Sequence, residues 1–258
     1  MLSKEEITGG LSTAIVGKKL FFFESIDSTN SCARALGDAG TAEGAVVVAE
    51  HQTSGRGRLG RTWLADPGTS LLFSVLLRPS ITLETAGLLT LYASAAIARA
   101  VERCVGLSVE CKWPNDLLLQ GRKFCGILIE NSFQQSGLAY SVIGAGINVH
   151  QAEFPPEIAD RATSLSRETG RALDRDKIFQ SVLSELDTMY EDVRRGKFQV
   201  AVSAWKERCS MFGRTITVQE HDSTVSGVAA RLHHDGGLII ETDQGERTIY
   251  AGDVTVVA

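Results

Sequence analysis

Short apolar runs, separated by glycines and polar turns, recur along the first part of the chain. Apolar runs of this length between turn residues are typical of buried strands. The clearest are residues 45–49 (AVVVA) and 70–77 (SLLFSVLL). The same pattern, with fewer apolar residues, predicts further strands at residues 20–24, 108–112, 117–119, 124–131 and 139–147.

Helical patterns interrupt these runs at only a few places. Residues 28–36 begin with Ser-Thr-Asn, and Gly37 and Gly40 are expected to end that helix. Residues 83–105 are rich in Ala and Leu and nearly uncharged in their first half, so they predict a helix packed against the sheet. Strands broken by a few helices favour a mixed α+β domain over a regular βαβ alternation.

The pattern changes after residue 150. Residues 151–170 read as a loop, and residues 174–195 and 197–209 predict two helices. Beyond Gly213, short strands alternate with Asp-, Gly- and Ser-containing turns, a spacing typical of a small β-barrel. These strands are predicted at residues 214–220, 225–232, 238–242, 246–250 and 254–257. The sequence therefore predicts two domains, 1–212 and 213–258.

Composition narrows the class of protein. The 258 residues are 43% hydrophobic with a formal net charge of −5, which excludes a disordered chain and argues against a general nucleic-acid binder. The five cysteines include no C-x-x-C pair, so free, buried thiols are expected rather than disulfides or zinc. No run approaches the length of a membrane span, and the amphipathic N-terminus, where Ser3 and Glu6 have capping-box spacing, lacks a signal-peptide core. A cytoplasmic location without membrane partners is expected.

A glycine–arginine loop, residues 53–61, follows the second predicted strand and contains GRGRLGR. Its G-x-G-x-x-G spacing is not followed by the helix that a dinucleotide fingerprint requires, and no P-loop sequence occurs. Glycines let the backbone approach a ligand closely, and arginine forks suit phosphate or carboxylate groups. We expect a mobile cationic loop that closes over an anion, although an exposed basic turn would share this composition.

Two turns of the sequence carry further charged and polar residues that could lie near this loop. Lys112-Trp113-Pro114-Asn115-Asp116 ends one strand, and a second turn brings Lys123 close in sequence. Cations and a carboxylate could meet at one end of the sheet, where Asp116 could hold Mg²⁺ beside phosphates. A solvated hairpin is the plainer alternative. The strand end GAGINV carries Asn148, whose amide offers both a donor and an acceptor. His233-His234, with no third ligand expected nearby, is interpreted as solvated rather than metal-binding.

Taken together, these segments resemble the biotin–protein ligase family, also called biotin–[acetyl-CoA-carboxylase] ligases. The resemblance runs from about Phe21 to Val257 through Ser-Thr-Asn, Glu-His-Gln, GRGRLGR, KWPNDL and GAGINV. It implies a mixed-sheet synthetase-like core, similar to class II aminoacyl-tRNA synthetases, and a C-terminal SH3-like β-barrel. Only a short segment precedes the first strand, so the chain resembles the monofunctional type, without the N-terminal DNA-binding domain of bifunctional members and with no DNA partner.

The resemblance also implies site residues. Lys123, Lys112 and Arg58 would be catalytic, and Asp116 would hold Mg²⁺. Biotin would be bound by Ser28, Thr29, Asn30, Gln52, Gly55, Arg56, Gly57, Arg58, Lys123 and Gly126. The nucleotide would be bound by Arg58, Arg61, Trp63, Lys112, Asn115 and Asn148.

The implied activity uses ATP and Mg²⁺ to convert biotin to biotinyl-5′-AMP and then transfers biotin to a lysine of a biotin carboxyl carrier protein. A lipoate–protein ligase or octanoyltransferase is an alternative with the same architecture, and a ligand-sensing regulator or binding module is an alternative from another class. The GRGRLGR loop favours biotin, and Lys112 and Lys123 favour an active enzyme. A homodimer could form through the strand predicted within residues 137–147.

Overall fold

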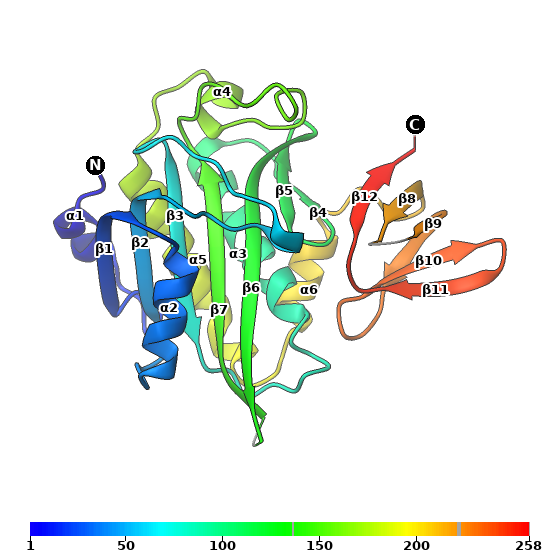
Figure 1. The fold of residues 1–258 in the computed structure, drawn as a ribbon, viewed down its shortest axis with the longest axis horizontal. Helices are drawn as coiled ribbons and strands as arrows, with labels where there is room; N and C mark the ends of the chain where they lie inside the picture. Colours follow the sequence, from blue (N-terminus) through cyan, green and yellow to red (C-terminus); the bar gives the residue numbers. More distant parts are fainter. Residues whose placement is uncertain (136, 221–222, 258) are drawn as a thin grey trace.

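A mixed seven-stranded sheet forms the body of the protein. The computed structural model describes residues 1–135, 137–220 and 223–257 (Figure 1). The strand order is β1-β2-β3-β7-β6-β5-β4; β1 and β2 are parallel and every other neighbouring pair is antiparallel. The strands are β1 (Lys19–Ile26), β2 (Ala45–Gln52), β3 (Ser70–Leu77), β4 (Glu110–Lys112), β5 (Asp116–Leu119), β6 (Arg122–Gln134) and β7 (Gly137–Asn148).

Helices cover both faces of this sheet (Figure 1). Helix α2 (Thr29–Asp38) packs on one face, where alternate side chains such as Val47 and Leu76 join its Ala33. Helices α3 (Leu88–Val105) and α5 (Arg175–Val193) pack on the other, where the rings of Phe73 and Phe179 lie 5.1 Å apart. All eight positions of β3 are buried, as expected for a strand with both faces covered.

Two predicted helix ends are wrong. Helix α3 begins at Leu88 rather than residue 83, because Thr82 and Thr85 form a turn in which each backbone N–H bonds the other hydroxyl. Gly37 does not end α2 but lies within it, where a Cβ would come within 2.9 Å of the Tyr140 ring. Close packing, not helix termination, explains that glycine.

A short helix, α4 (Leu165–Thr169), lies in the segment expected to be a loop. The Ser164 hydroxyl accepts a hydrogen bond from the Arg167 N–H at its start, and Gly170 adopts φ 65° at its end. One turn of helix gives too little periodicity to be recognised in sequence. The other helices are α1 (Lys4–Gly10), where the Ser3 hydroxyl accepts from the Glu6 N–H as its spacing predicted, and α6 (Gln199–Lys206).

A second, antiparallel sheet forms the C-terminal part of the chain, seen in orange to red in Figure 1. Its strand order is β11-β10-β9-β8-β12. Trp113 Nε1 donates to the Gly236 carbonyl at 3.1 Å and so ties this sheet to the turn before β5. The strands are β8 (Thr215–Gln219), β9 (Thr224–Leu232), β10 (Leu238–Thr242), β11 (Gly245–Ile249) and β12 (Asp253–Val256).

Within the described sheet, most of the strand considered for a homodimer, residues 137–147, already has a partner on both sides, and the homodimer itself stays a prediction. Strand β7 pairs with β6 along its length and with β3 from Ser141 to Asn148, so it lies inside the sheet. The five cysteines are free, and Cys111 and Cys125 are buried. In the part of the chain that the structure describes, no helix is both long and apolar enough to cross a membrane.

A buried ion pair ties the sheet to α5. Arg175 donates to Glu50 at 2.8 Å, and both side chains are 10% exposed. Burial opposes ionisation of Glu50, but the hydrogen bonds from Arg175 and from the Leu2 backbone N–H outweigh it, so the pKa of Glu50 lies below its usual 4.5. This carboxylate therefore stabilises the fold above its usual pKa, and the contribution is lost as the pH falls through the lowered value.

We expect Glu50→Gln to lower the free energy of unfolding by about 3 kcal/mol at neutral pH, because it leaves Arg175 buried without a counter-charge. Urea unfolding at neutral pH and at about pH 3 measures the effect, which should shrink at the lower pH. The matched control is Glu191→Gln, which removes the exposed Arg195–Glu191 pair and should cost under about 1 kcal/mol. Equal losses for the two variants would contradict this interpretation.

Candidate functional site

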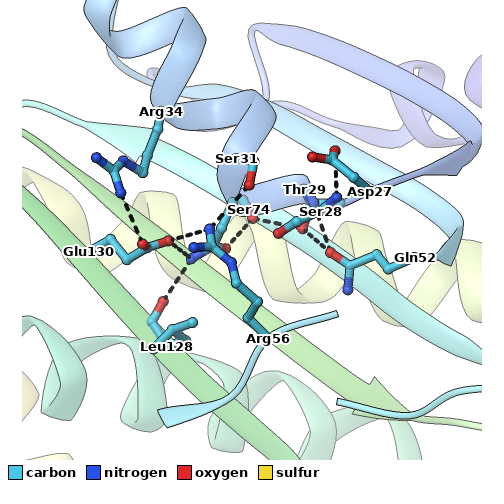
Figure 2. A network of polar contacts seen from close by, with 11 residues as sticks. Asp27, Ser28, Thr29, Ser31, Arg34, Gln52, Arg56, Ser74, Leu128 and Glu130 are labelled. Atoms are coloured by element: carbon cyan, nitrogen blue, oxygen red, sulfur yellow. Dashed lines mark hydrogen bonds and ion pairs between the residues drawn. The ribbon is translucent and has the colours of Figure 1, made fainter. Parts of the chain in front are cut away.

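A chain of polar contacts lies where α2 begins, beside the end of β2 and the middle of β3 (Figure 2). Thr29 donates its backbone N–H and its hydroxyl to Gln52 Oε1 at 2.7 and 3.0 Å. The buried Ser74 hydroxyl lies 2.8 Å from Thr29 Oγ1 and 2.6 Å from Asn30 Oδ1. Because Gln52 turns its oxygen toward Thr29, its amide nitrogen remains able to donate to a ligand.

Glycine makes room for this chain of contacts. A Cβ on Gly144 of β7 would lie 1.9 Å from Asn30 Oδ1, so only glycine lets the Asn30 amide rest on the strand. Ser28 precedes α2 and is 3% exposed; its backbone N–H donates to Asp27 at 2.6 Å. The structure thus brings four predicted biotin residues to one corner of the sheet: Ser28, Thr29, Asn30 and Gln52.

The glycine–arginine loop forms a compact turn. The Gly57 N–H donates to the Arg61 carbonyl at 2.7 Å, and a Cβ on the buried Gly55 would come within 2.5 Å of the Trp63 carbonyl. Leu59 adopts φ 55°, a region that costs a branched residue strain, and is 62% exposed.

The three arginines of this loop reach three different parts of the protein. Arg56 donates to Glu130 at 3.0 Å, and Arg58 donates to Asn115 at 3.1 Å. Arg61 pairs with Asp253 of the C-terminal sheet, and this hydrogen bond lowers the pKa of Asp253. Burial lowers the pKa of the Arg58 guanidinium, while Asp116 and Asp253 oppose that shift. The half-buried Arg58 guanidinium is held over the site by its hydrogen bond to Asn115.

The Trp63 ring lies on a glycine floor formed by β6 and β7. A Cβ on Gly146 would come within 2.4 Å of this ring, and one on Gly126 within 2.8 Å. The ammonium group of Lys123 lies 5.6 Å from the ring centroid. The segment after the glycine–arginine loop, the turn that carries Lys123 and the end of β7 therefore meet at one surface.

Lys123 is paired with Asp116, at 2.6 Å between Nζ and Oδ1. Its backbone is held as well, because Lys123 N–H donates to the Arg161 carbonyl and its carbonyl accepts from the Thr163 N–H, both at 2.8 Å. A single carboxylate beside Lys123 and the loop arginines fits Mg²⁺ that would be held mainly by substrate phosphates.

Two further residues predicted to bind the nucleotide, Lys112 and Asn148, have other contacts in the structure. Lys112 pairs in register with Asp116 and contributes to lowering the pKa of Asp253, so it belongs to the same charged end of the sheet. Asn148 is 4% exposed, and its amide donates to the Thr163 carbonyl at 3.1 Å. In the structure Asn148 therefore bonds the segment that holds Lys123.

An adjoining cavity of about 190 Å³ lies between the two sheets. Arg58 and Asn115 line it from one side, and Asp235 and Tyr250 of the C-terminal part line it from the other. Its walls include three apolar residues of β6, namely Ile127, Leu128 and Ile129.

Sequence reasoning missed several residues that support the site. Ser74 and Glu130 both form hydrogen bonds with the Asn30 side chain. The Glu168 carboxylate, whose side chain is 2% exposed, pairs with Arg122 at 2.6 Å and also accepts a hydrogen bond from the Thr163 hydroxyl. Of these residues, only Ser74 was recognisable from the sequence, because it is a polar residue inside an otherwise apolar run.

The interpretation of His233 and His234 needs correction on one point. Asp235 lies close to both, and the donor atoms of the three residues are within 4.8 Å of one another. His233 Nδ1 lies 2.8 Å from Asp235 Oδ1. The sequence did not predict Asp235 as a third possible ligand, because only the folded turn brings its carboxylate back to His233.

We expect backbone amides of residues 53–61 to exchange rapidly in the free protein and to become protected with biotin and ATP. Two of the arginines that hold this loop, Arg56 and Arg61, are well exposed, so their ion pairs restrain it weakly, whereas a bound anion supplies a stronger partner. Hydrogen exchange with mass spectrometry measures this, with β3 as the internal reference. Equal protection of the loop in both states would show that it does not close over a ligand.

Comparison with known proteins gives concordant matches. Residues 22–148 match the profile of the Biotin/lipoate A/B protein ligase family, and residues 211–257 match the Biotin protein ligase C terminal domain. The chain is 35% identical to the bifunctional ligase/repressor BirA of Bacillus subtilis, over 98% of this chain and 78% of that protein. It is also 35% identical to the biotin–[acetyl-CoA-carboxylase] ligase of Mycobacterium tuberculosis, over 88% of this chain and 85% of that one.

A solved structure agrees with these sequence matches. Biotin protein ligase from Aquifex aeolicus, in complex with biotin and ATP, superposes with a TM-score of 0.79 at 31% identity, covering 93% of this chain and 99% of that one. The sequence relatives and the solved structure therefore indicate the same family. The chain belongs to the biotin/lipoate A/B protein ligase family, among its biotin protein ligases.

Proposed function

We propose that this chain is an ATP-dependent biotin–protein ligase that forms biotinyl-5′-AMP and transfers biotin to a lysine of a biotin carboxyl carrier domain. One observation carries the proposal. Along one face of β7, Gly144 supports the Asn30 network, Gly146 supports Trp63, and Asn148 follows at the strand end. These alternate positions span about 13 Å, a flat track for an extended ligand with a polar group at each end.

Biotin is placed at the Gly144 end of this track. Its ureido ring meets Ser28, Thr29 and Asn30 at the start of α2 and the free amide nitrogen of Gln52. Gly126 and the backbone of Gly55 to Gly57 allow close approach along its body. The ligand carboxylate then points toward the cations Arg58 and Lys123, which suit an anion.

The nucleotide is placed at the other end. Trp63 offers an aromatic face to adenine, and Arg58, Arg61 and Lys112 offer cations to phosphate groups. Asn115, which holds Arg58, and Asn148, at the end of β7, are the amides proposed for the nucleotide. Asp116 would hold Mg²⁺ together with phosphate oxygens, and the ion would supply charge neutralisation there.

The reaction follows from this arrangement. A carboxylate oxygen of biotin attacks the α-phosphorus of ATP, the bond to the β-phosphate breaks, and pyrophosphate leaves. Lys123 and Arg58 stabilise negative charge that is spread over the transferring group, which is the main catalytic term in such displacements. The amine of the acceptor lysine then attacks the acyl carbon of the mixed anhydride, and AMP leaves. Until then the glycine–arginine loop excludes water.

We assign activation to residues 1–212 and propose that residues 213–258 form an SH3-like barrel that restrains the loop. The Arg61–Asp253 pair and the bond from Trp113 to Gly236 support this restraining role. The acceptor is a biotin carboxyl carrier domain, whose lysine must reach the acyl carbon from the open side of the loop.

A lipoate ligase or octanoyltransferase is the alternative within the same family. Lipoate lacks the ureido group that the Thr29–Gln52–Ser74–Asn30 network fits, so that network favours biotin. Labelled biotin and labelled lipoate, each offered with ATP, Mg²⁺ and carrier domains of both kinds, separate the two activities. The proposal expects incorporation of biotin alone, and incorporation of lipoate in its place would overturn it.

A further inference from the structure

Glu130 of β6 holds donors from three directions with one carboxylate (Figure 2). Asn30 Nδ2 donates to it at 2.8 Å, Arg56 at 3.0 Å and Arg34 at 3.3 Å. The first lies at the start of α2, the second in the glycine–arginine loop and the third further along α2. This carboxylate therefore connects the ureido corner, formed by Ser28, Thr29, Asn30 and Gln52, with the glycine–arginine loop.

The charge of Glu130 also fixes the orientation of the Asn30 side chain. A carboxylate only accepts hydrogen bonds, so Asn30 must turn its nitrogen to Glu130 and its oxygen to Ser74. The Ser74 hydroxyl, which is fully buried, then donates to that oxygen at 2.6 Å. Asn30 is 5% exposed, so a wrong orientation would leave buried polar atoms unpaired at considerable cost.

Arg56 is affected in the same way. Its guanidinium contacts Glu130 and, at 3.2 Å, the hydroxyl of Ser31, so its charge is already matched by a protein carboxylate. Arg58, in contrast, has a neutral partner, Asn115. Arg58 is thus the loop arginine that remains for the ligand carboxylate near this corner, whereas Arg56 anchors the loop.

We propose that Glu130 is a positioning residue for biotin binding: it orients Asn30 in the ureido corner and anchors the loop through Arg56. This inference rests on the proposed function. It predicts that Glu130 controls affinity for biotin without touching it, and that affinity for ATP is largely independent of it.

The test is Glu130→Gln, which keeps the shape of the side chain and removes its charge. Biotin affinity, measured by calorimetry on the full chain, should weaken about ten- to a hundredfold, as expected for losing hydrogen bonds to a charged group. The KM for ATP and the melting temperature should stay near those of the unmodified protein, and exchange of residues 53–61 in the biotin complex should increase. Arg34→Ala is the matched control, because it removes the most exposed partner of the same carboxylate and should change biotin affinity less than threefold.

A double-mutant cycle separates positioning from general damage. Because Arg56 acts through Glu130, Arg56→Ala and Glu130→Gln should weaken biotin binding by less together than the product of their separate effects. Unchanged biotin affinity in Glu130→Gln, an equal rise in the KM values for biotin and ATP, or independent effects in the cycle would overturn the inference. If Glu130→Gln folds poorly, Glu130→Asp carries the same test with a smaller expected loss. Failure of the unmodified protein to bind biotin would instead overturn the proposed function.

Discussion

Replacing Lys123 with alanine should slow adenylate formation by several hundredfold, a loss on the order of 3–4 kcal/mol in transition-state stabilisation. Its ammonium group lies beside Asp116 and the Trp63 ring, at the point of the track where carboxylate and phosphate are expected to meet. The backbone of Lys123 is fixed by its two hydrogen bonds to residues 161–163, so the loss should arise from the side chain alone. Release of pyrophosphate from ATP in the presence of biotin measures the step.

The fold should survive this change, since the Lys123 side chain is 34% exposed. Circular dichroism and the melting temperature check that. Lys177→Ala, which removes an exposed lysine of α5, serves as the matched control and should leave the rate unchanged. A near-normal rate of pyrophosphate release from Lys123→Ala would remove this residue from the catalytic machinery.

Replacing Arg58 with glycine should both weaken biotin binding and release the adenylate from the site. Arg58 is half-buried over the track and is held by Asn115, so it can contact the ligand where carboxylate joins phosphate. A charge-assisted contact of this kind is worth about 1.5–3 kcal/mol, and its loss should raise the Kd for biotin tenfold or more. The loop should then open while the reactive anhydride is still bound.

Escaped biotinyl-AMP would label lysines indiscriminately. Incubation of Arg58→Gly with biotin, ATP, Mg²⁺ and albumin, followed by a blot for biotin, detects this, and albumin should be labelled strongly. Arg195→Gly, at an exposed arginine near the end of α5, provides the control and should leave albumin unlabelled. Unlabelled albumin and unchanged biotin affinity in Arg58→Gly would show that this arginine is not a gate.

The strands were predictable where burial is continuous. The boundaries of β3 coincide with the apolar run at residues 70–77, because such a run can be satisfied only inside a sheet. Strand β6 extends beyond both of its predicted ends, because Arg122 and Lys123 pair with β5 and because pairing with β7 continues to Gln134, where the side chains turn polar. The parallel pairing of β1 with β2 and the interior place of β7 depend on topology, which the pattern of residues does not contain.

The site was predictable where chemistry is concentrated in short segments. The glycine–arginine loop and the Lys112–Asp116 turn stand out because glycine, arginine and paired charges are costly between buried strands. Glu130 did not stand out, because a single carboxylate in a strand is ordinary until the fold brings Asn30 and Arg56 to it. The roles of the glycines at 144 and 146 likewise appear only once Asn30 and Trp63 are placed against them.

The most direct test of this account is the intact mass of a biotin carboxyl carrier domain after incubation with the purified protein, biotin, ATP and Mg²⁺, together with the nucleotide product. The account predicts addition of one biotin to a single lysine, strictly dependent on ATP, with AMP and pyrophosphate formed in equal amounts. No change in mass, a change that requires no ATP, or ADP as the product would contradict it.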